Sequence, residues 1–174
     1  MSSERLYYTD AYLIEFDAVV RDVLKQGDRW KVTLDRTAFY PTSGGQPFDA
    51  GSLGDAQVVD VVDQEDGSIG HFVDRELETN SRVRGHIDWT RRFDHMQQHS
   101  GQHLLSAAFE REVGAKTVGF HLGASSATID LDKELSGDRI SGVEETANGV
   151  LWEDREIVVR IVTADEAMRL PLRK

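Results

Sequence analysis

The sequence predicts an α+β protein in which a small N-terminal β-barrel-like domain precedes an α/β domain with an antiparallel or mixed sheet. Three observations support this fold class. Short segments of alternating polar and apolar residues fill the chain to about residue 88. Apolar residues with helical spacing follow from residue 93, and strand-like and helical segments then alternate. We therefore divide the chain into a domain over residues 1–88 and a second domain over residues 89–174.

The strands of the first domain are predicted from alternation and from the turn residues between them. Residues 18–24 and 30–35 flank the turn Gln26-Gly27-Asp28-Arg29, which is a typical hairpin pattern. Further strands are expected at 56–62, 69–73 and 82–88. Short strands at this spacing are typical of a small barrel or a sandwich.

The second domain begins with a predicted helix over residues 93–113. Its apolar residues recur with a helical period, Asp94 is the expected N-cap, and Gly114 is the expected residue just beyond the end. The elements expected after it are a strand at 126–131, a helix at 139–153, a buried strand at 157–162 and a short helix from Thr163 to about Pro171.

Composition restricts the class of protein. The 174 residues carry 20 Lys and Arg against 31 Asp and Glu, a net charge of −11, and 39% are hydrophobic. No apolar run is long enough for a membrane span and no signal peptide is visible, so we expect a soluble, cytoplasmic protein with no membrane partner. The absence of Cys excludes disulfide and thiol chemistry within these residues.

The acidic balance also argues against broad, charge-driven binding of nucleic acid, although a local basic patch remains compatible with one particular RNA. Candidates for such a patch are Arg82, Arg84, Arg91 and Arg92. Clusters of this kind are more often solvated surface.

Three histidines lie four residues apart in the predicted helix: His95, His99 and His103. Side chains at i and i+4 are neighbours on a helix and can share one Zn²⁺. All three cannot share it, because residues eight apart are separated by roughly 12 Å along the axis. A polar helix face is the alternative interpretation. A zinc-protease H-E-x-x-H site is disfavoured, since Met96 and Ser100 stand where the Glu would be.

A glycine-containing loop over residues 39–51 is the second candidate site. Gly44 and Gly45 permit close backbone approach, and Thr42, Ser43 and Gln46 add hydrogen-bonding side chains. This composition suits the binding of a small polar ligand, and it equally suits a plain β-turn. His121, in the segment 117–123, could line a site or cap a turn, and the structural role is favoured for a lone His.

In combination, Phe39-Tyr40-Pro41-Thr42-Ser43-Gly44-Gly45-Gln46 and the later His99-Ser100-Gly101-Gln102-His103 resemble the editing module of alanyl-tRNA synthetase and the free-standing AlaX-type trans-editing proteins. The order of the two motifs, about fifty residues apart, is more specific than either alone. The resemblance runs from about residue 8 to residue 174 and implies that the second domain is an editing-type, synthetase additional-type domain, here incomplete.

The resemblance also implies a function. That family hydrolyses wrongly aminoacylated tRNA-Ala, chiefly Ser-tRNA-Ala and in some members Gly-tRNA-Ala. Ligands of Zn²⁺ would be His99 and His103, and His95 would not be one. Catalytic roles would fall to Gln46, Thr42 and Ser43, and substrate-binding roles to Gly44, Gly45 and His121. The partner would be the acceptor end of tRNA-Ala carrying the wrong amino acid.

A hydrolytic site separate from the synthetase's own aminoacylation pocket has a physical rationale. An aminoacylation pocket built for Ala cannot strongly exclude Gly, or Ser with its added hydroxyl. Metal and substrate loop must lie within one small-molecule length, so we expect the Gly44-Gly45 loop to face His99 and His103 across the domain junction.

One departure from the family pattern bears on activity. The family completes its zinc site with a downstream Cys-x-x-x-His segment, and this sequence has no Cys and no His after His121. The sequence is therefore either part of a longer protein or a natural short form, and we expect activity in a longer chain rather than in these 174 residues. The alternative function is a metal-free, non-catalytic module that binds tRNA or another partner.

Overall fold

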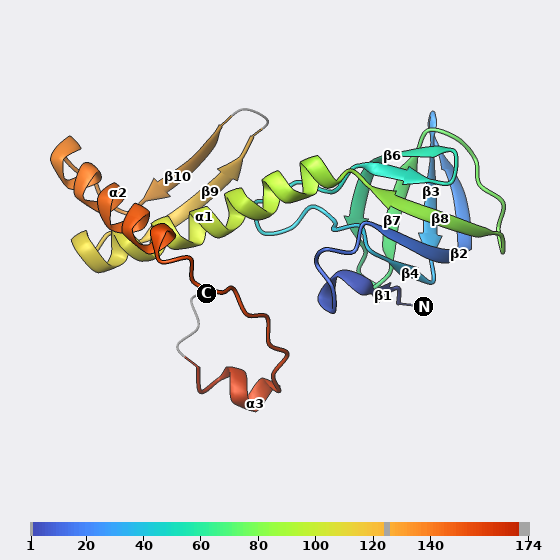
Figure 1. The fold of residues 1–174 in the computed structure, drawn as a ribbon. Helices are drawn as coiled ribbons and strands as arrows, with labels where there is room; N and C mark the ends of the chain where they lie inside the picture. Colours follow the sequence, from blue (N-terminus) through green and yellow to red (C-terminus); the bar gives the residue numbers. More distant parts are fainter. Residues whose placement is uncertain (1, 124–125, 171–174) are drawn as a thin grey trace.

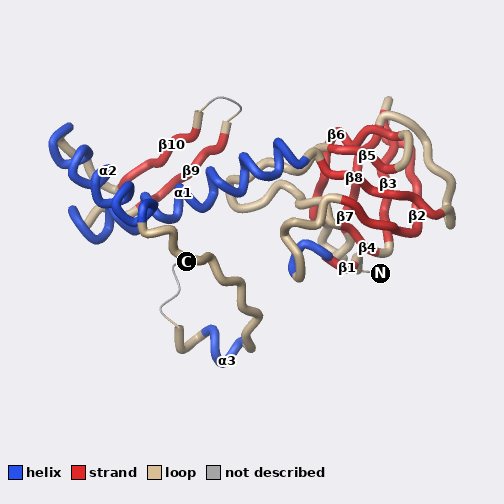
Figure 2. Tube along the Cα trace, in the orientation of Figure 1, coloured by secondary structure: helices blue, strands red, loops and turns tan. Residues whose placement is uncertain are grey.

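The computed structural model describes residues 2–123 and 126–170. A β-barrel lies at one end of a long helix, and a smaller assembly of helices and a β-hairpin lies at the other end (Figure 1). Strands dominate the N-terminal half and helices the C-terminal half (Figure 2). The predicted α+β class with a barrel-like N-terminal part is thus confirmed.

The barrel is closed by six strands in which all neighbours pair antiparallel. In spatial order they are β2 (Glu15–Gln26), β3 (Arg29–Leu34), β7 (Ile69–Val73), β6 (Ala56–Asp63), β5 (Gly51–Leu53) and β8 (Arg82–Ile87). The predicted hairpin is found as β2 and β3, whose turn places Gly27 at φ 65°. Full closure leaves no exposed sheet edge, and it decides between the two architectures predicted for the first half.

Several short elements were not predicted. They are β1 (Glu4–Arg5), the 3-10 helix η1 (Leu6–Tyr8), β4 (Arg36–Thr37) and β5. Each is too short to display a period in the sequence. β1 pairs parallel with β4 outside the barrel.

The barrel interior is mainly apolar and contains a buried imidazole. Val20, Val32 and Val61 are fully buried, as is His71, whose ring nitrogens meet Thr37 Oγ1 at 2.8 Å and the Val32 carbonyl oxygen at 3.1 Å. Nδ1 therefore donates to the carbonyl and Nε2 accepts from the hydroxyl. Burial lowers the pKa of His71 to about 4, so the ring is neutral.

Helix α1 (Trp89–Val113) begins four residues earlier than predicted. The predicted N-cap Asp94 is wrong: Asp88 caps the helix by accepting a hydrogen bond from the Arg91 amide at 3.1 Å. Apolar residues recur with a helical period only from residue 93, because the first turn of the helix contains two arginines. The start of the helix was therefore predicted too late. Gly114 ends the helix in the left-handed conformation at φ 65°, as predicted.

The C-terminal half of α1 packs against β9 (Thr117–Leu122), β10 (Ala127–Leu131) and α2 (Gly137–Trp152) (Figure 1). β9 and β10 form an antiparallel hairpin. Their shared core contains Ala108 and Phe109 of α1 and Val143 and Ala147 of α2. The predicted strand at 126–131 and helix at 139–153 are confirmed, whereas strand β9 was not predicted as a strand.

The predicted buried strand at 157–162 is wrong. This segment has no regular structure, and Ile157 and Ile161 are 77% and 82% exposed. Its β-branched run has the propensity of a strand, yet it pairs with no strand among the described residues, and a strand needs a neighbour to satisfy its backbone.

The short helix expected after Thr163 is found as α3 (Ala164–Ala167), capped by Thr163 and Glu166 in a reciprocal capping box. Its predicted end at Pro171 lies outside the described residues.

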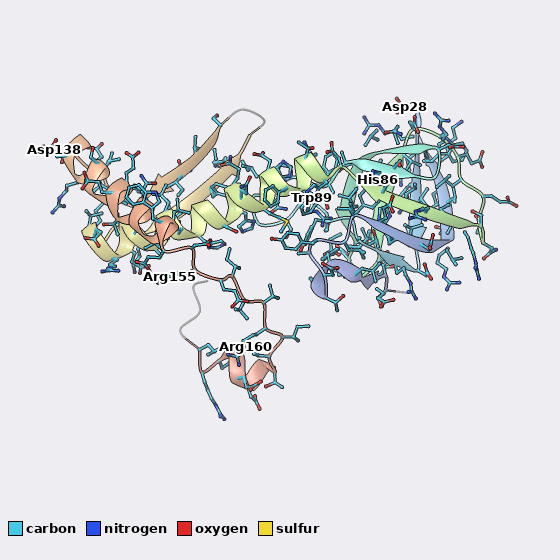
Figure 3. The ribbon with its side chains drawn as sticks, viewed as in Figure 1. Asp28, His86, Trp89, Asp138, Arg155 and Arg160 are labelled. Atoms are coloured by element: carbon cyan, nitrogen blue, oxygen red, sulfur yellow. The ribbon has the colours of Figure 1, made fainter. Side chains whose placement is uncertain are left out.

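Among the helices of residues 2–123 and 126–170, none has the length and apolar character needed to cross a membrane. β8 ends at Ile87 and α1 starts at Trp89, at the point where the helix leaves the barrel (Figure 3). The division into domains 1–88 and 89–174 stays a prediction.

Candidate functional site

The Gly-Gly-Gln loop forms a tight two-residue turn. Ser43 and Gln46 exchange backbone hydrogen bonds of 3.1 and 2.9 Å, and the two residues between them, Gly44 and Gly45, have φ of 57° and 82°. Both angles lie in the region that glycine adopts without strain. Thr42 Oγ1 accepts from the Phe48 amide at 3.2 Å, so its hydroxyl stabilises the loop. The turn presents the Gln46 side chain toward α1.

A buried ion pair fixes this loop to α1. The side chains of Asp49 and Arg92 are both fully buried. Arg92 Nε donates to both Asp49 carboxylate oxygens at 2.9 Å, and Arg92 Nη2 donates to Asp49 Oδ2 at 2.5 Å. Nη1 donates to the carbonyl of Ala11 and Nη2 to that of Ala38. The guanidinium also lies 4.5 Å from the Tyr40 ring centroid.

Arg92 was predicted to be one of a group of basic surface residues, and this is wrong, because its side chain is fully buried. A buried guanidinium needs a carboxylate and carbonyl acceptors, and Asp49 with two backbone oxygens supplies them. Asp49 lies 43 residues before Arg92, and no pattern in the sequence links the two. The pair was therefore not predicted. Of the other three, Arg84 pairs with Glu15 at 2.6 Å, Arg91 lies against the Phe48 ring, and Arg82 is exposed.

The two predicted motifs meet at the middle of α1. Gln46 Oε1 lies 2.8 Å from His99 Nδ1, and His99 Nε2 lies 3.0 Å from His103 Nε2. Because an amide oxygen accepts but does not donate, His99 Nδ1 carries the proton, and the Nε2 lone pair accepts from His103 Nε2. The expected approach of the loop to the histidine helix is therefore found.

The His99–His103 pair has a geometry that suits two ligands of one zinc ion. Two nitrogens bound tetrahedrally at ~2.0–2.1 Å are separated by about 3.3 Å, and the two Nε2 atoms are 3.0 Å apart. Gln46 holds the tautomer of His99 that a metal requires. No group of three or more His, Cys, Asp or Glu suited to a metal occurs in residues 2–123 and 126–170. The described chain thus provides two of the ligands that such an ion needs.

Protonation of His99 is disfavoured. Burial, and secondarily the adjacent His103, lower the pKa of His99. His95, one turn earlier, is buried and its Nδ1 has no hydrogen-bond partner in the described part of the chain. Burial and then the charge of Arg91 lower the pKa of His95. His95 is not part of the His99–His103 contact, and its exclusion from the ligand set stays a prediction.

His121 lies apart from this cluster. Its neighbour Phe120 faces α1, with its ring centroid 6.4 Å from that of His99. Successive strand residues point to opposite faces, so the His121 side chain points the other way, where it is 77% exposed and 3.5 Å from Asp130. Its predicted role in substrate binding stays a prediction. Phe120, whose carbonyl oxygen lies 3.0 Å from the position of a Cβ on Gly45, was missed because a lone Phe carries no sequence signal.

Comparison with known proteins identifies the family. A family model described as tRNA synthetases class II (A) matches residues 3–91. The alanyl-tRNA editing protein AlaX-M of Methanosarcina acetivorans is 38% identical over 178 residues, which cover 95% of this chain and 71% of that protein.

Two longer relatives also match. AlaX-L of Pyrococcus horikoshii is 36% identical over 98% of this chain and 44% of its own length. Aarsd1-B of Xenopus laevis, also named an alanyl-tRNA editing protein, is 39% identical over 79% of this chain and 33% of its own length. The chain belongs to the AlaX family of alanyl-tRNA editing proteins.

Proposed function

We propose that this chain carries the editing site of an aminoacyl-tRNA deacylase that hydrolyses Ser-tRNA-Ala, and Gly-tRNA-Ala as a further substrate. The observation that carries the proposal is the contact of Gln46 with His99, because it joins the substrate loop and the histidine helix in one site. The names of the relatives support alanyl-tRNA editing as the general activity.

His99 and His103 would hold Zn²⁺ through Nε2. When bound, the metal would polarise the ester or activate a water. Gln46 fixes the His99 ring by accepting from Nδ1, and the neutral state favoured for His99 keeps its lone pair available. The backbone of Gly44 and Gly45 allows the close approach of an aminoacyl ester. Thr42 accepts from the Phe48 amide and keeps its own hydroxyl proton, so Thr42 and Ser43 each offer a donor to the seryl group.

The test measures serine released from Ser-tRNA-Ala by the 174-residue chain and by a longer chain that includes Cys-x-x-x-His, each with and without zinc. Catalytic zinc sites usually have three protein ligands and one open position. We therefore expect chelator-sensitive release by the longer chain and little by the short one. Full chelator-sensitive activity in the short chain would contradict the ligand assignment. Absence of release by both chains, with tRNA binding retained, would favour the alternative of a metal-free binding module.

Metal content separates the three histidines. In the longer chain, His103→Ala should lose zinc and His95→Ala should retain it, because His99 and His103 are the pair in mutual contact and the pair that matches the family motif. Equal loss of zinc in the two variants would overturn the assignment of His99 and His103 as the ligand pair.

A further inference from the structure

A cavity of about 360 Å³ lies between α1 and the β9–β10 hairpin, outside the Gln46–His99–His103 contact. Its polar lining includes the amides of Gln97, Gln98 and Gln102 and the hydroxyl of Thr128, and its apolar lining includes Phe120 and Leu105. None of its lining residues is charged. The volume falls in the range of small-molecule sites, and a neutral lining does not suit a phosphate or a carboxylate.

Phe120 separates this cavity from the candidate hydrolytic site. Its ring lines the cavity and lies 6.4 Å, centroid to centroid, from His99, and its backbone lies against Gly45. A group bound in the cavity is therefore next to the place where the ester would lie. In an aminoacylated RNA the ester is carried by a ribose, and the base on that ribose is the group able to enter a neighbouring cavity.

We propose that the cavity binds the adenine base of the esterified 3′-terminal nucleotide, an inference that rests on the function proposed above. Unpaired bases stack on aromatic side chains, and Phe120 offers a ring. Glutamine amides recognise adenine through its N6 and N7 atoms. Gln102 is oriented by donating from Nε2 to Ser106 Oγ at 2.7 Å. The Gln98 amide forms no hydrogen bond within the described part of the chain and is available to a ligand.

Gly101 offers a way to fill the cavity. It lines the cavity from the middle of α1, and a Cβ added to it would meet no heavy atom within 4 Å. Gly101→Leu therefore adds its Cβ without a clash, at a position that lines the cavity. Gly142→Leu is the matched control, because Gly142 is an exposed glycine of α2 that also has open space and does not line the cavity.

The probe is AMP, with UMP for comparison, titrated into the isotope-labelled 174-residue chain and followed by NMR. We expect AMP to shift the Gly101 backbone amide and the Gln98 and Gln102 side-chain amides, and to bind about tenfold more tightly than UMP. Gly101→Leu should abolish these shifts and Gly142→Leu should retain them. Gln98→Met, which keeps the side-chain length, should weaken the binding of AMP and leave the affinity for UMP unchanged. The spectrum of each variant also reports whether it is folded.

AMP binding retained in Gly101→Leu, equal affinity for AMP and UMP, or no shift at these amides would each overturn the proposal. The two proposals fail separately. Serine release by the longer chain without a cavity response to AMP contradicts the base site alone. A cavity response to AMP without serine release contradicts the deacylase alone.

Discussion

The buried pair of Asp49 and Arg92 allows a quantitative prediction of how the barrel is fixed to α1. Both side chains are fully buried, and the guanidinium donates three hydrogen bonds to the carboxylate. Removal of one member leaves the other charge unpaired in the interior, which costs ~3–5 kcal/mol. We expect Arg92→Met and Asp49→Asn each to lower the free energy of unfolding by that amount.

The double variant should lose less than the sum of the two single losses, because no unpaired charge remains, and we expect a coupling energy of about 2–3 kcal/mol. The assay is urea denaturation of all four proteins, followed by tryptophan fluorescence and by circular dichroism. Single losses below ~1 kcal/mol, or strictly additive losses, would refute the conclusion that this pair is buried and mutually compensating.

Two further predictions concern the barrel and the loop. The pKa of buried His71 is about 4 in the folded state, and its ordinary value is 6.5, so the folded state binds fewer protons than the unfolded state. The stability that neutral His71 contributes is therefore complete above pH 6.5 and is lost as the pH falls toward 4. At pH 4.5 the loss is about 2.5 kcal/mol. Denaturation of the unmutated protein and of His71→Gln at pH 7.5 and 4.5 measures this loss. The unmutated protein should lose more unfolding free energy between the two pH values than His71→Gln does, and an equal loss in both would contradict the prediction. Gly45→Ala and Gly54→Ala both place a Cβ at positive φ, and each should cost about 1–2 kcal/mol in unfolding free energy. Only Gly45→Ala meets Phe120, so in the longer chain it alone should slow serine release, and equal rates for both would contradict the role of that contact.

Most of the barrel could be predicted from sequence because its strands are regular. β3 alternates and is bounded by a glycine turn, and β8 alternates buried and exposed residues along its whole length. β4 and β5 were missed because two or three residues show no period. The segment 157–162 was predicted wrongly for the opposite reason: its propensity is strong, and pairing, which sequence does not reveal, is absent in the described chain.

The parts of the candidate site that depend on the spacing of nearby residues could be predicted from the sequence. His99 and His103 lie one turn apart, and Gly44-Gly45 marks a turn, so both could be named. The residues that bring these motifs together could not. Asp49 and Arg92 are 43 positions apart, and Phe120 joins the site through contacts made by tertiary packing.

A double-mutant cycle in serine release tests whether the Gly-Gly-Gln loop and the histidine helix act as one site. In the longer, zinc-loaded chain, kcat/KM would be measured for Gln46→Leu, His99→Leu and the double variant. Groups that act as a unit show grossly non-additive losses. We expect the double variant to be no slower than His99→Leu alone. Losses that multiply would show instead that Gln46 and His99 act independently.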